Sequence, residues 1–121
     1  MTVGLWLAVA AVGGCGAVAR FLLDSAIGAR VGRPFPFGTF TINLSGAFLL
    51  GILTGLDLTP AALLVAGTAT IGSYTTFSTW MLESQRLTEE GDARGAALNL
   101  LVSLVLGAAV AALGLMIGAH L

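Results

Sequence analysis

The amino-acid sequence predicts an all-α membrane protein with four transmembrane helices. Of its 121 residues, 57% are hydrophobic and only 9% are charged, and the mean hydropathy is +1.00. Because a soluble domain carries about 25% charged residues to cover its surface, the outer surface of this chain has to face lipid. The few charged residues also separate four uncharged runs. Each run is long enough for the roughly 20 residues that cross a bilayer as a helix.

The first two spans are predicted at residues 3–24 and 37–56 of a single domain that covers residues 1–121. A loop is expected between them over residues 24–37, with these charged residues and prolines: Asp24, Arg30, Arg33, Pro34 and Pro36. A tight turn from Asp57 to Pro60 follows the second span. Thr59 or Asp57 is expected to cap the third helix, with Pro60 in its first turn.

The third span, residues 60–82, is predicted to break near its middle. Seven serine and threonine hydroxyls lie within residues 68–79, on both sides of Gly72. Such side chains compete with the helical backbone for hydrogen bonds, and glycine weakens the helix further. We expect the break between Gly72 and Thr76, where protein, water or an ion has to satisfy the freed backbone groups. The alternative is that these hydroxyls bond back to their own helix and only pack.

The fourth span is predicted at residues 95–119, after a solvated connector from Glu83 to Arg94 that carries six charged residues. Glycines recur at four-residue spacing in the second and fourth spans: Gly51, Gly55, Gly114 and Gly118. Small residues at this spacing let membrane helices approach closely and associate. Four helices of this length form a thin bundle, so we also expect oligomerisation.

Two polar side chains inside the spans are candidates for function. Asn43 shares one helix face with Thr39, and its amide either joins two helices by a hydrogen bond or lines a pore. Arg20 follows 19 uncharged residues, with Asp24 one turn later as a candidate partner. Its side chain either reaches to the membrane boundary or draws anions toward a pore mouth.

Composition argues against several functional classes. The net charge of −1 gives no reason to expect nucleic-acid binding. The single cysteine, Cys15, excludes an intrachain disulfide and a multi-cysteine metal site, and the single histidine, His120, argues against a histidine-based catalytic centre, so no enzyme is expected. A small four-helix multidrug exporter needs a membrane-embedded carboxylate. No acidic residue precedes Asp24 in the first span, and none lies inside the other spans.

Three motifs together resemble the Fluc (CrcB) family of fluoride channels. Glycines followed by Gly-Ala-x-x-Arg occur over residues 13–20, and Gly-Thr-x-x-x-Asn-x-x-Gly occurs over residues 38–46. The family's broken-helix motif, Gly-Gly-x-Thr-Thr-Phe-Ser-Thr-Phe, is similar to residues 72–80, with two changes. Because the order and spacing of the motifs agree with the family, the resemblance covers nearly the whole chain.

The resemblance implies a fluoride-selective channel subunit, and not an enzyme, in the cell inner (plasma) membrane. Such a subunit exports fluoride passively and lowers cytoplasmic fluoride. Subunits of the family assemble as an antiparallel, dual-topology dimer. The resemblance also implies a structural Na⁺ at the dimer centre, held by the backbone carbonyls of Gly72 and Thr75.

By the same resemblance, Asn43 donates to fluoride and Phe77 presents its ring edge, which is the positive end of the ring quadrupole. Arg20 lies near the aqueous vestibule. The other pore positions that the family implies are Thr39, Ser78, Thr79, Trp80 and Ser103. Hydroxyls, amides and ring edges can replace the water around fluoride without a full positive charge that would trap the ion.

Four positions depart from the family pattern. Ser73 replaces the second glycine of the break, and Trp80 replaces the second phenylalanine. Asn99 and Gly107 stand where the fourth helix usually has tyrosine and serine, and they share one helix face with Ser103. These departures leave an alternative open, in which the chain is a pore-poor structural partner subunit of a heterodimeric fluoride channel.

The basic residues predict one orientation in the membrane. Four spans place both termini and the turn at Asp57 on one side, which has no lysine or arginine. The opposite side holds Arg30, Arg33, Arg86 and Arg94. Basic residues in short loops stay cytoplasmic, so both termini are expected outside. An antiparallel homodimer needs both orientations. The partner is therefore either a second copy or a related chain with the opposite bias.

Overall fold

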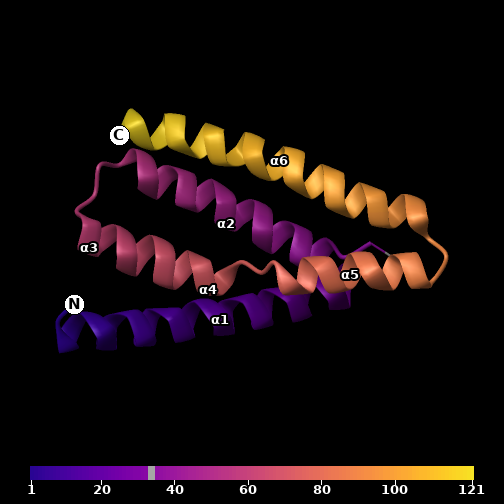
Figure 1. The fold of residues 1–121 in the computed structure, drawn as a ribbon, viewed down its shortest axis with the longest axis horizontal. Coiled ribbons are helices and arrows are strands. Elements are labelled where there is room, and N and C mark those ends of the chain that lie inside the picture. The colour runs from indigo at the N-terminus through magenta and orange to yellow at the C-terminus, as the bar shows by residue number, and fades with distance from the viewer. Residues whose placement is uncertain (33–34) are drawn as a thin grey trace.

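A computed structural model describes residues 1–32 and 35–121, so Arg33 and Pro34, which fall in the expected loop, lie outside the described residues. Every regular element in these ranges is a helix, and the chain forms four helical stretches (Figure 1). Three stretches are single long helices: α1 (Val3–Val31), α2 (Phe37–Gly55) and α6 (Ala93–Ala119). The third stretch is interrupted and consists of α3 (Pro60–Leu63), the π-helical η1 (Leu64–Ile71), α4 (Gly72–Tyr74) and α5 (Ser78–Glu89).

The four stretches run up and down the molecule. Both termini lie at one end, together with the turn between α2 and α3, and the connection from α5 to α6 lies at the other end (Figure 1). The predicted order of four helices, with a bend in the third, is therefore confirmed.

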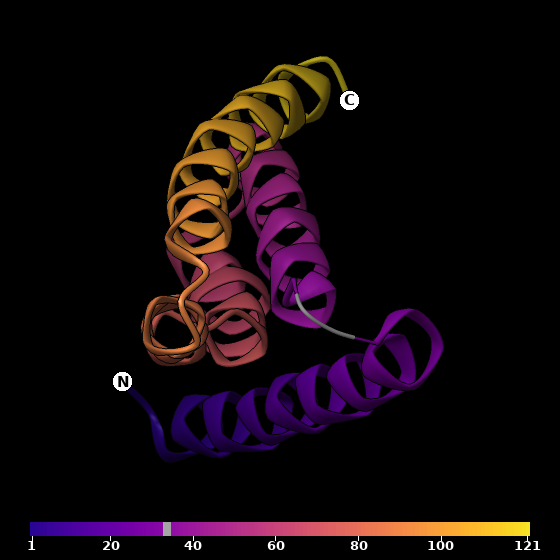
Figure 2. The same ribbon diagram turned by 90° about the vertical axis from the view of Figure 1, so that its right-hand side faces the viewer.

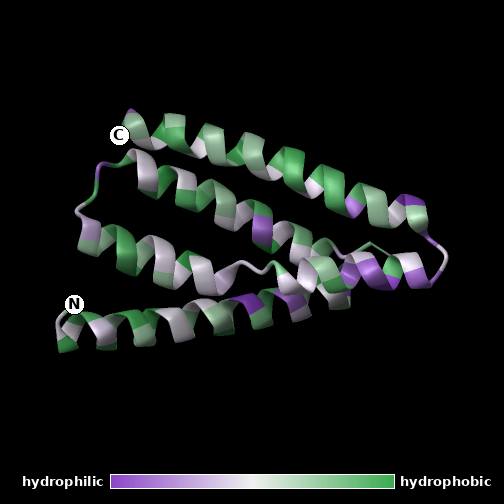
Figure 3. Ribbon diagram, in the orientation of Figure 1, coloured by the Kyte–Doolittle hydropathy of each residue, from purple (hydrophilic) through white to green (hydrophobic). Residues whose placement is uncertain are grey.

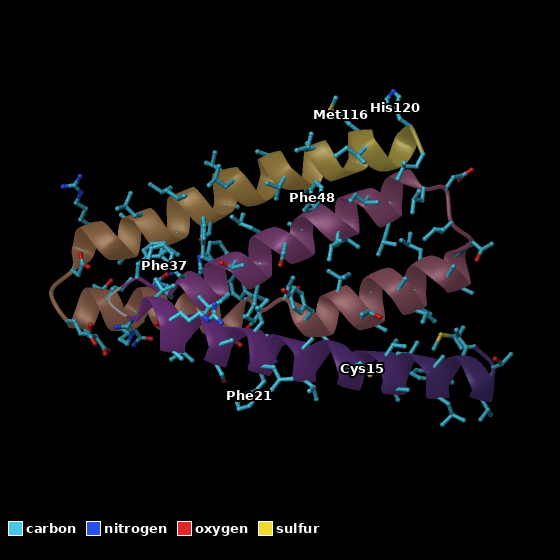
Figure 4. All side chains as sticks on the ribbon, turned by 180° about the vertical axis from the view of Figure 1, so that it is seen from behind. Cys15, Phe21, Phe37, Phe48, Met116 and His120 are labelled. Atoms are coloured by element: carbon cyan, nitrogen blue, oxygen red, sulfur yellow. The ribbon has the colours of Figure 1, made fainter. Side chains whose placement is uncertain are left out.

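The long helices have the composition of membrane spans. By length and hydropathy, α1, α2 and α6 are each able to cross a bilayer, and hydrophobic residues predominate along them (Figure 3). Large apolar side chains such as Phe21 and Met116, which are 69% and 62% exposed, point away from the bundle (Figure 4). Exposed apolar surface on this scale is stable only in contact with lipid or another subunit.

Helix α1 is longer than expected. The interpretation of residues 24–37 as a loop is wrong for residues 25–31, which continue the helix to Val31. This segment contains no proline, and Arg30 in the last turn interacts favourably with the negative end of the helix dipole. The helix ends at Gly32, whose positive φ of 70° is a conformation that glycine adopts without strain.

The solvated connector expected over residues 83–94 is wrong for most of its length, because α5 continues to Glu89. Arg86 explains this extension. Its guanidinium pairs with Glu83 at 2.7 Å and with Glu90 at 3.0 Å, three and four residues away along the same helix face. These carboxylates raise the pKa of Arg86 above its ordinary value, chiefly through its hydrogen bond to Glu83.

Short turns at the two ends of the bundle agree with the local sequence. The Thr59 side chain accepts a hydrogen bond from the Ala62 N–H at 3.2 Å, with Pro60 in the first turn, so Thr59 caps the third stretch as expected. At the other end, Gly91 adopts a positive φ of 84°, and the Asp92 side chain accepts from the Gly95 N–H at 2.8 Å. Asp92 therefore starts α6 directly after a turn of minimal length.

Helices α2 and α6 lie against each other along much of their length, as the end view shows (Figure 2). The glycines predicted to permit close packing lie in this contact. A Cβ atom at Gly51 or Gly55 would overlap the α6 backbone, and a Cβ at Gly114 or Gly118 would overlap the α2 backbone. The prediction that these small residues allow close helix approach is confirmed, within one chain rather than between chains.

Candidate functional site at the broken helix

The third stretch breaks at residues 75–77, between α4 and α5. Thr75 is extended, with φ −81° and ψ 162°, whereas Gly72 is still helical, with φ −61°. The break therefore lies at the C-terminal edge of the predicted segment and does not begin at its glycine. A serine- and threonine-rich sequence allows a break over several residues, and a side chain of another helix contacts the residues where it occurs.

Asn43 of α2 supplies these contacts. Its Nδ2 donates to the Thr76 carbonyl at 2.9 Å, and its Oδ1 accepts from the Thr76 N–H at 2.9 Å. The predicted pore residue thus binds both backbone groups of one residue in the break. Since Nδ2 carries two hydrogens, one N–H of Asn43 is left for another acceptor.

Thr76 also caps the second half of the broken helix. Its Oγ1 accepts from the Thr79 N–H at 3.2 Å and lies 3.2 Å from the Thr79 hydroxyl. In a continuous helix, the N–H groups of Thr76 and Thr79 would bond to the carbonyls of Gly72 and Thr75. In this structure the side chains of Asn43 and Thr76 accept from these two N–H groups instead. The Gly72 and Thr75 carbonyls, which the family resemblance assigns to Na⁺, are therefore among the carbonyls that lose their helical partners at the break.

Arg20 reaches the same break from α1. Its Nη1 donates to the Thr75 carbonyl at 3.2 Å. The expected pairing with Asp24 is not formed, although both side chains lie in the described part of the chain. Because the carbonyls at the end of a helix carry partial negative charge, a partly buried guanidinium is stabilised there as a cap.

A groove of about 670 Å³ runs beside the break, between α2, η1 and α6. It brings together four predicted pore residues: Asn43, Phe77, Trp80 and Ser103. Gly72, Thr75 and Gly107 line it as well. The other predicted pore residues lie outside it. Thr39 is buried and lines a smaller cavity of about 210 Å³, while Ser78 and Thr79 lie at the start of α5.

The Phe77 side chain lines this groove and is 70% exposed. Its ring contacts Trp80 edge to face, with centroids 5.8 Å apart and an angle of 83° between the ring planes. This arrangement is the one that aromatic quadrupoles favour. The two residues of the aromatic motif are therefore neighbours, and Trp80 supports the ring of Phe77.

Trp80 is tied to α6 through a polar network. Its indole N–H donates to the Asn99 carbonyl at 3.0 Å, and the fully buried Asn99 side chain donates to the Ser84 hydroxyl at 2.8 Å. Ser84 donates in turn to the Trp80 carbonyl at 2.9 Å. Two of the departures from the family pattern, Trp80 and Asn99, are thus partners of each other.

Sequence reasoning missed Ser84 and the specific part played by Thr76. Ser84 lies in the segment interpreted from the sequence as solvated. The only signal for its role is that it follows Trp80 by four residues, which places both on one helix face. Thr76 was one of seven similar hydroxyls. Two buried polar atoms have no hydrogen-bond partner among the described residues, Asn99 Oδ1 and Ser103 Oγ, and the second belongs to a residue that lines the groove.

Comparison with known proteins agrees with this geometry. The model of the family described as CrcB-like protein, Camphor Resistance (CrcB), matches residues 7–115. The fluoride-specific ion channel FluC 2 of Mycolicibacterium paratuberculosis is 58% identical, over 93% of this chain and 93% of that protein. FluC 2 of Mycobacterium tuberculosis is 53% identical, over 94% of this chain and 90% of its own length.

A more distant relative extends the comparison. The fluoride-specific ion channel FluC 1 of Symbiobacterium thermophilum is 43% identical over 93% of this chain and 96% of its own length. The matches therefore cover all four helical stretches, including the break. Together with the interrupted third stretch and the position of Asn43 against it, they show that the chain belongs to the CrcB/FluC fluoride-specific ion channel family.

Proposed function

We propose that this chain is one subunit of a fluoride-selective channel that lets fluoride leave the cell passively and so lowers cytoplasmic fluoride. The observation that carries the proposal is the groove beside the break, where Asn43 and Ser103 bring polar hydrogens and Phe77 brings a ring. The described residues that line this groove include no lysine or arginine. The relatives at 53–58% identity, which are named fluoride-specific ion channels, support the same function.

The chemistry of the groove suits a small, strongly hydrated anion. An N–H, an O–H and an aromatic edge each present positive density to an anion, so they can replace part of its water shell. None carries a full charge, so fluoride can bind and still leave. Thr39 on α2, with Ser78 and Thr79 at the start of α5, would continue this polar path beyond the groove.

The groove is completed by a second subunit in this proposal. Phe77 is 70% exposed in a single chain, and the polar groups of the groove beside it would lack partners if this face met lipid. An antiparallel dimer would cover this face and bring a second aromatic pair to the same region. We take the partner to be a second copy of the chain. The alternative partner is a related chain of opposite orientation, and it is favoured by the arginines gathered at one end of the bundle.

The residues at the break suit a structural Na⁺ at the dimer centre. The Gly72 and Thr75 carbonyls have lost their helical donors to Asn43 and Thr76. A carbonyl oxygen has two lone pairs, so the bond from Arg20 to the Thr75 carbonyl leaves one for a cation. Hard cations prefer oxygen ligands. When bound, the ion would neutralise the partial negative charge of the break, and Gly72 and Thr75 would hold it.

Arg20 fits the part of a fixed positive charge at the vestibule. Its guanidinium bonds to the Thr75 carbonyl, so it is directed inward to the break rather than outward to the membrane boundary. A positive potential at this point raises the local concentration of anions. The Thr75 carbonyl holds the guanidinium of Arg20 in place. Arg20 itself is not among the described residues that line the groove.

Fluoride efflux from liposomes that contain the purified protein tests the proposal. We expect fluoride to leave within the time of the recording while chloride, the control ion, stays inside. Protein-free liposomes give the background. Folded protein that releases no fluoride would contradict the channel function of this chain alone. Efflux that appears only after a related chain is added would support the heterodimer.

A further inference from the structure

We propose that Asn43 is a positioning residue that creates the break in the third helix by pairing with Thr76. We further infer that this pairing turns the Asn43 amide so that only an N–H is offered to the pore. The observation is the pair of 2.9 Å hydrogen bonds from one side chain to both backbone groups of Thr76. The second part of the proposal rests on the proposed fluoride function, whereas the first part does not.

The pairing has the geometry of a β-bridge. In an antiparallel pair, two residues exchange both of their N–H···O=C bonds, and the Asn43 carboxamide, which carries the same groups as a peptide, exchanges both with Thr76. Such a partner requires an extended backbone. Thr75 next to it is extended, with φ −81° and ψ 162°. Asn43 therefore stabilises an extended segment in the middle of a helix.

This explains why the break lies at 75–77. The Thr76 N–H would otherwise bond to the Gly72 carbonyl and continue the helix. At membrane depth an extended backbone without partners is strongly disfavoured, so hydroxyl-rich composition alone is not sufficient. Asn43 satisfies both groups of Thr76, and Thr76 Oγ1 then restarts the helix by capping the Thr79 N–H. The break is thus formed by a contact between residues 33 positions apart.

Helix α2 is close enough to the break for so short a side chain to reach it. Gly46, three residues after Asn43, lies against the Thr75 side chain, and a Cβ atom at Gly46 would overlap the Thr75 Cγ2 atom. Asparagine has only one methylene between backbone and amide, so its reach is short, and glycine at position 46 leaves room for the Thr75 side chain between α2 and the break. Gly46 and Asn43 therefore act together in placing α2 on the break.

The pairing also selects which end of the amide meets an anion. With the amide reversed, Oδ1 would face the Thr76 carbonyl and Nδ2 would face the Thr76 N–H, and both contacts would be repulsive. In the observed orientation Oδ1 is engaged by the Thr76 N–H and one hydrogen of Nδ2 by the Thr76 carbonyl. The second hydrogen of Nδ2 remains for the groove that Asn43 lines. The acceptor atom, which would repel fluoride, is held away from it.

Hydrogen exchange at the Thr76 amide tests the pairing directly. The purified protein, labelled with ¹⁵N-threonine and kept in fluoride-free buffer, is compared as wild type, Asn43→Leu, Asn43→Asp and Thr54→Ala. Asn43→Leu keeps similar bulk but removes both bonds. Asn43→Asp retains an oxygen that accepts from the Thr76 N–H but loses the donor to the Thr76 carbonyl. Thr54→Ala is the matched control, because the Thr54 hydroxyl bonds only to the Leu50 carbonyl of its own helix.

We expect Thr76 exchange to be at least about tenfold faster in Asn43→Leu, as the loss of a net hydrogen bond predicts. In Thr54→Ala the Thr76 amide should stay protected, and in Asn43→Asp, which keeps an acceptor for this N–H, it should exchange more slowly than in Asn43→Leu. Equal Thr76 exchange in wild type and Asn43→Leu would overturn the proposal. If Asn43→Leu fails to assemble, the wild type decides, since Thr76 has no helical acceptor: a fast-exchanging Thr76 overturns the pairing and a protected one supports it.

Fluoride efflux from the same samples separates the two parts of the proposal. Asn43→Asp should protect Thr76 more than Asn43→Leu does and still lose fluoride efflux, because a carboxylate offers oxygens and no N–H to the anion. Normal efflux in Asn43→Asp would overturn the assignment of the free N–H to fluoride. If wild-type protein shows no efflux while Thr76 exchange follows Asn43 as expected, the channel function fails and the pairing stands.

Discussion

Phe77 depends on few contacts within its own chain, so its substitution tests the ring itself. Phe77→Ile keeps apolar bulk and removes the ring edge. We expect fluoride efflux to fall by at least about tenfold, the factor that corresponds to the loss of about 1.4 kcal/mol of fluoride stabilisation in the pore. Size-exclusion chromatography should show an unchanged assembly. Efflux equal to wild type would remove the Phe77 ring from the pathway.

Trp80 raises a different question, because its indole N–H is used by the Asn99 carbonyl. The part of Trp80 that meets the groove is therefore its ring. Trp80→Phe keeps a ring, so fluoride efflux should stay equal or rise, while thermal stability should fall by about 1 kcal/mol through the lost hydrogen bond. Trp6→Phe, at a side chain 61% exposed on α1, is the matched control. A large loss of efflux in Trp80→Phe would show that the indole itself is required.

At the scale of elements, the contact between α2 and α6 depends on glycine. A Cβ at Gly114 would overlap the Phe48 carbonyl of α2, and backbone atoms cannot move aside as a side chain can. Gly114→Ala should therefore lower thermal stability, by about 1–3 kcal/mol as expected for overpacking. Gly28→Ala is the control, because a Cβ there meets nothing within 4 Å. Equal melting temperatures for the two variants would contradict the close packing of α2 on α6.

The break in the third helix predicts a cation site that is formed by backbone carbonyls rather than by side chains. If Gly72 and Thr75 hold Na⁺ through carbonyls, Thr75→Ser should retain the ion, since the backbone is unchanged and the hydroxyl that donates to the Ile71 carbonyl remains. A crystal structure of this variant in sodium-containing buffer should show density between the break carbonyls of the two subunits. No such density at good resolution in wild type or variant would count against the site.

At the scale of the whole molecule, charge is distributed unevenly between the two ends. Arg30 ends α1, Arg86 lies in the last turn of α5 and Arg94 in the first turn of α6, and these termini share the end opposite both chain termini (Figure 1). The topology thus supports the orientation argument for the described arginines. Arg86 is paired with two carboxylates, but acidic residues contribute little to orientation.

Labelling of a cysteine placed near the C-terminus in intact cells, after Cys15 is replaced, measures this orientation. A homodimer requires labelling of equal amounts of protein from both sides of the membrane. The arginine bias alone predicts C-termini outside, and labelling from outside only would mean that the chain needs a partner of opposite orientation. Labelling from inside only would contradict the homodimer and the orientation that the arginines predict.

Local patterns in the sequence were sufficient to predict the helices. Uncharged runs define the four spans, four-residue glycine spacing predicts the α2–α6 contact, and Thr59–Pro60 predicts the start of the third stretch, because each signal depends on residues within one or two turns of one another. The same locality explains the two errors. Charged residues at 24–31 and 83–89 were interpreted as irregular, whereas they continue helices, and at 83–89 they are stabilised by ion pairs.

Only the tertiary structure decided which groups of the site form hydrogen bonds with one another. The sequence showed that Asn43, Arg20 and the hydroxyl cluster were polar groups needing partners in an apolar medium. It could not show that Asn43 meets Thr76 or that Arg20 meets the Thr75 carbonyl rather than Asp24. These partners lie 33 and 55 positions apart. Their meeting depends on how the glycine faces set the helix packing, whereas hydropathy and spacing report only on one helix at a time.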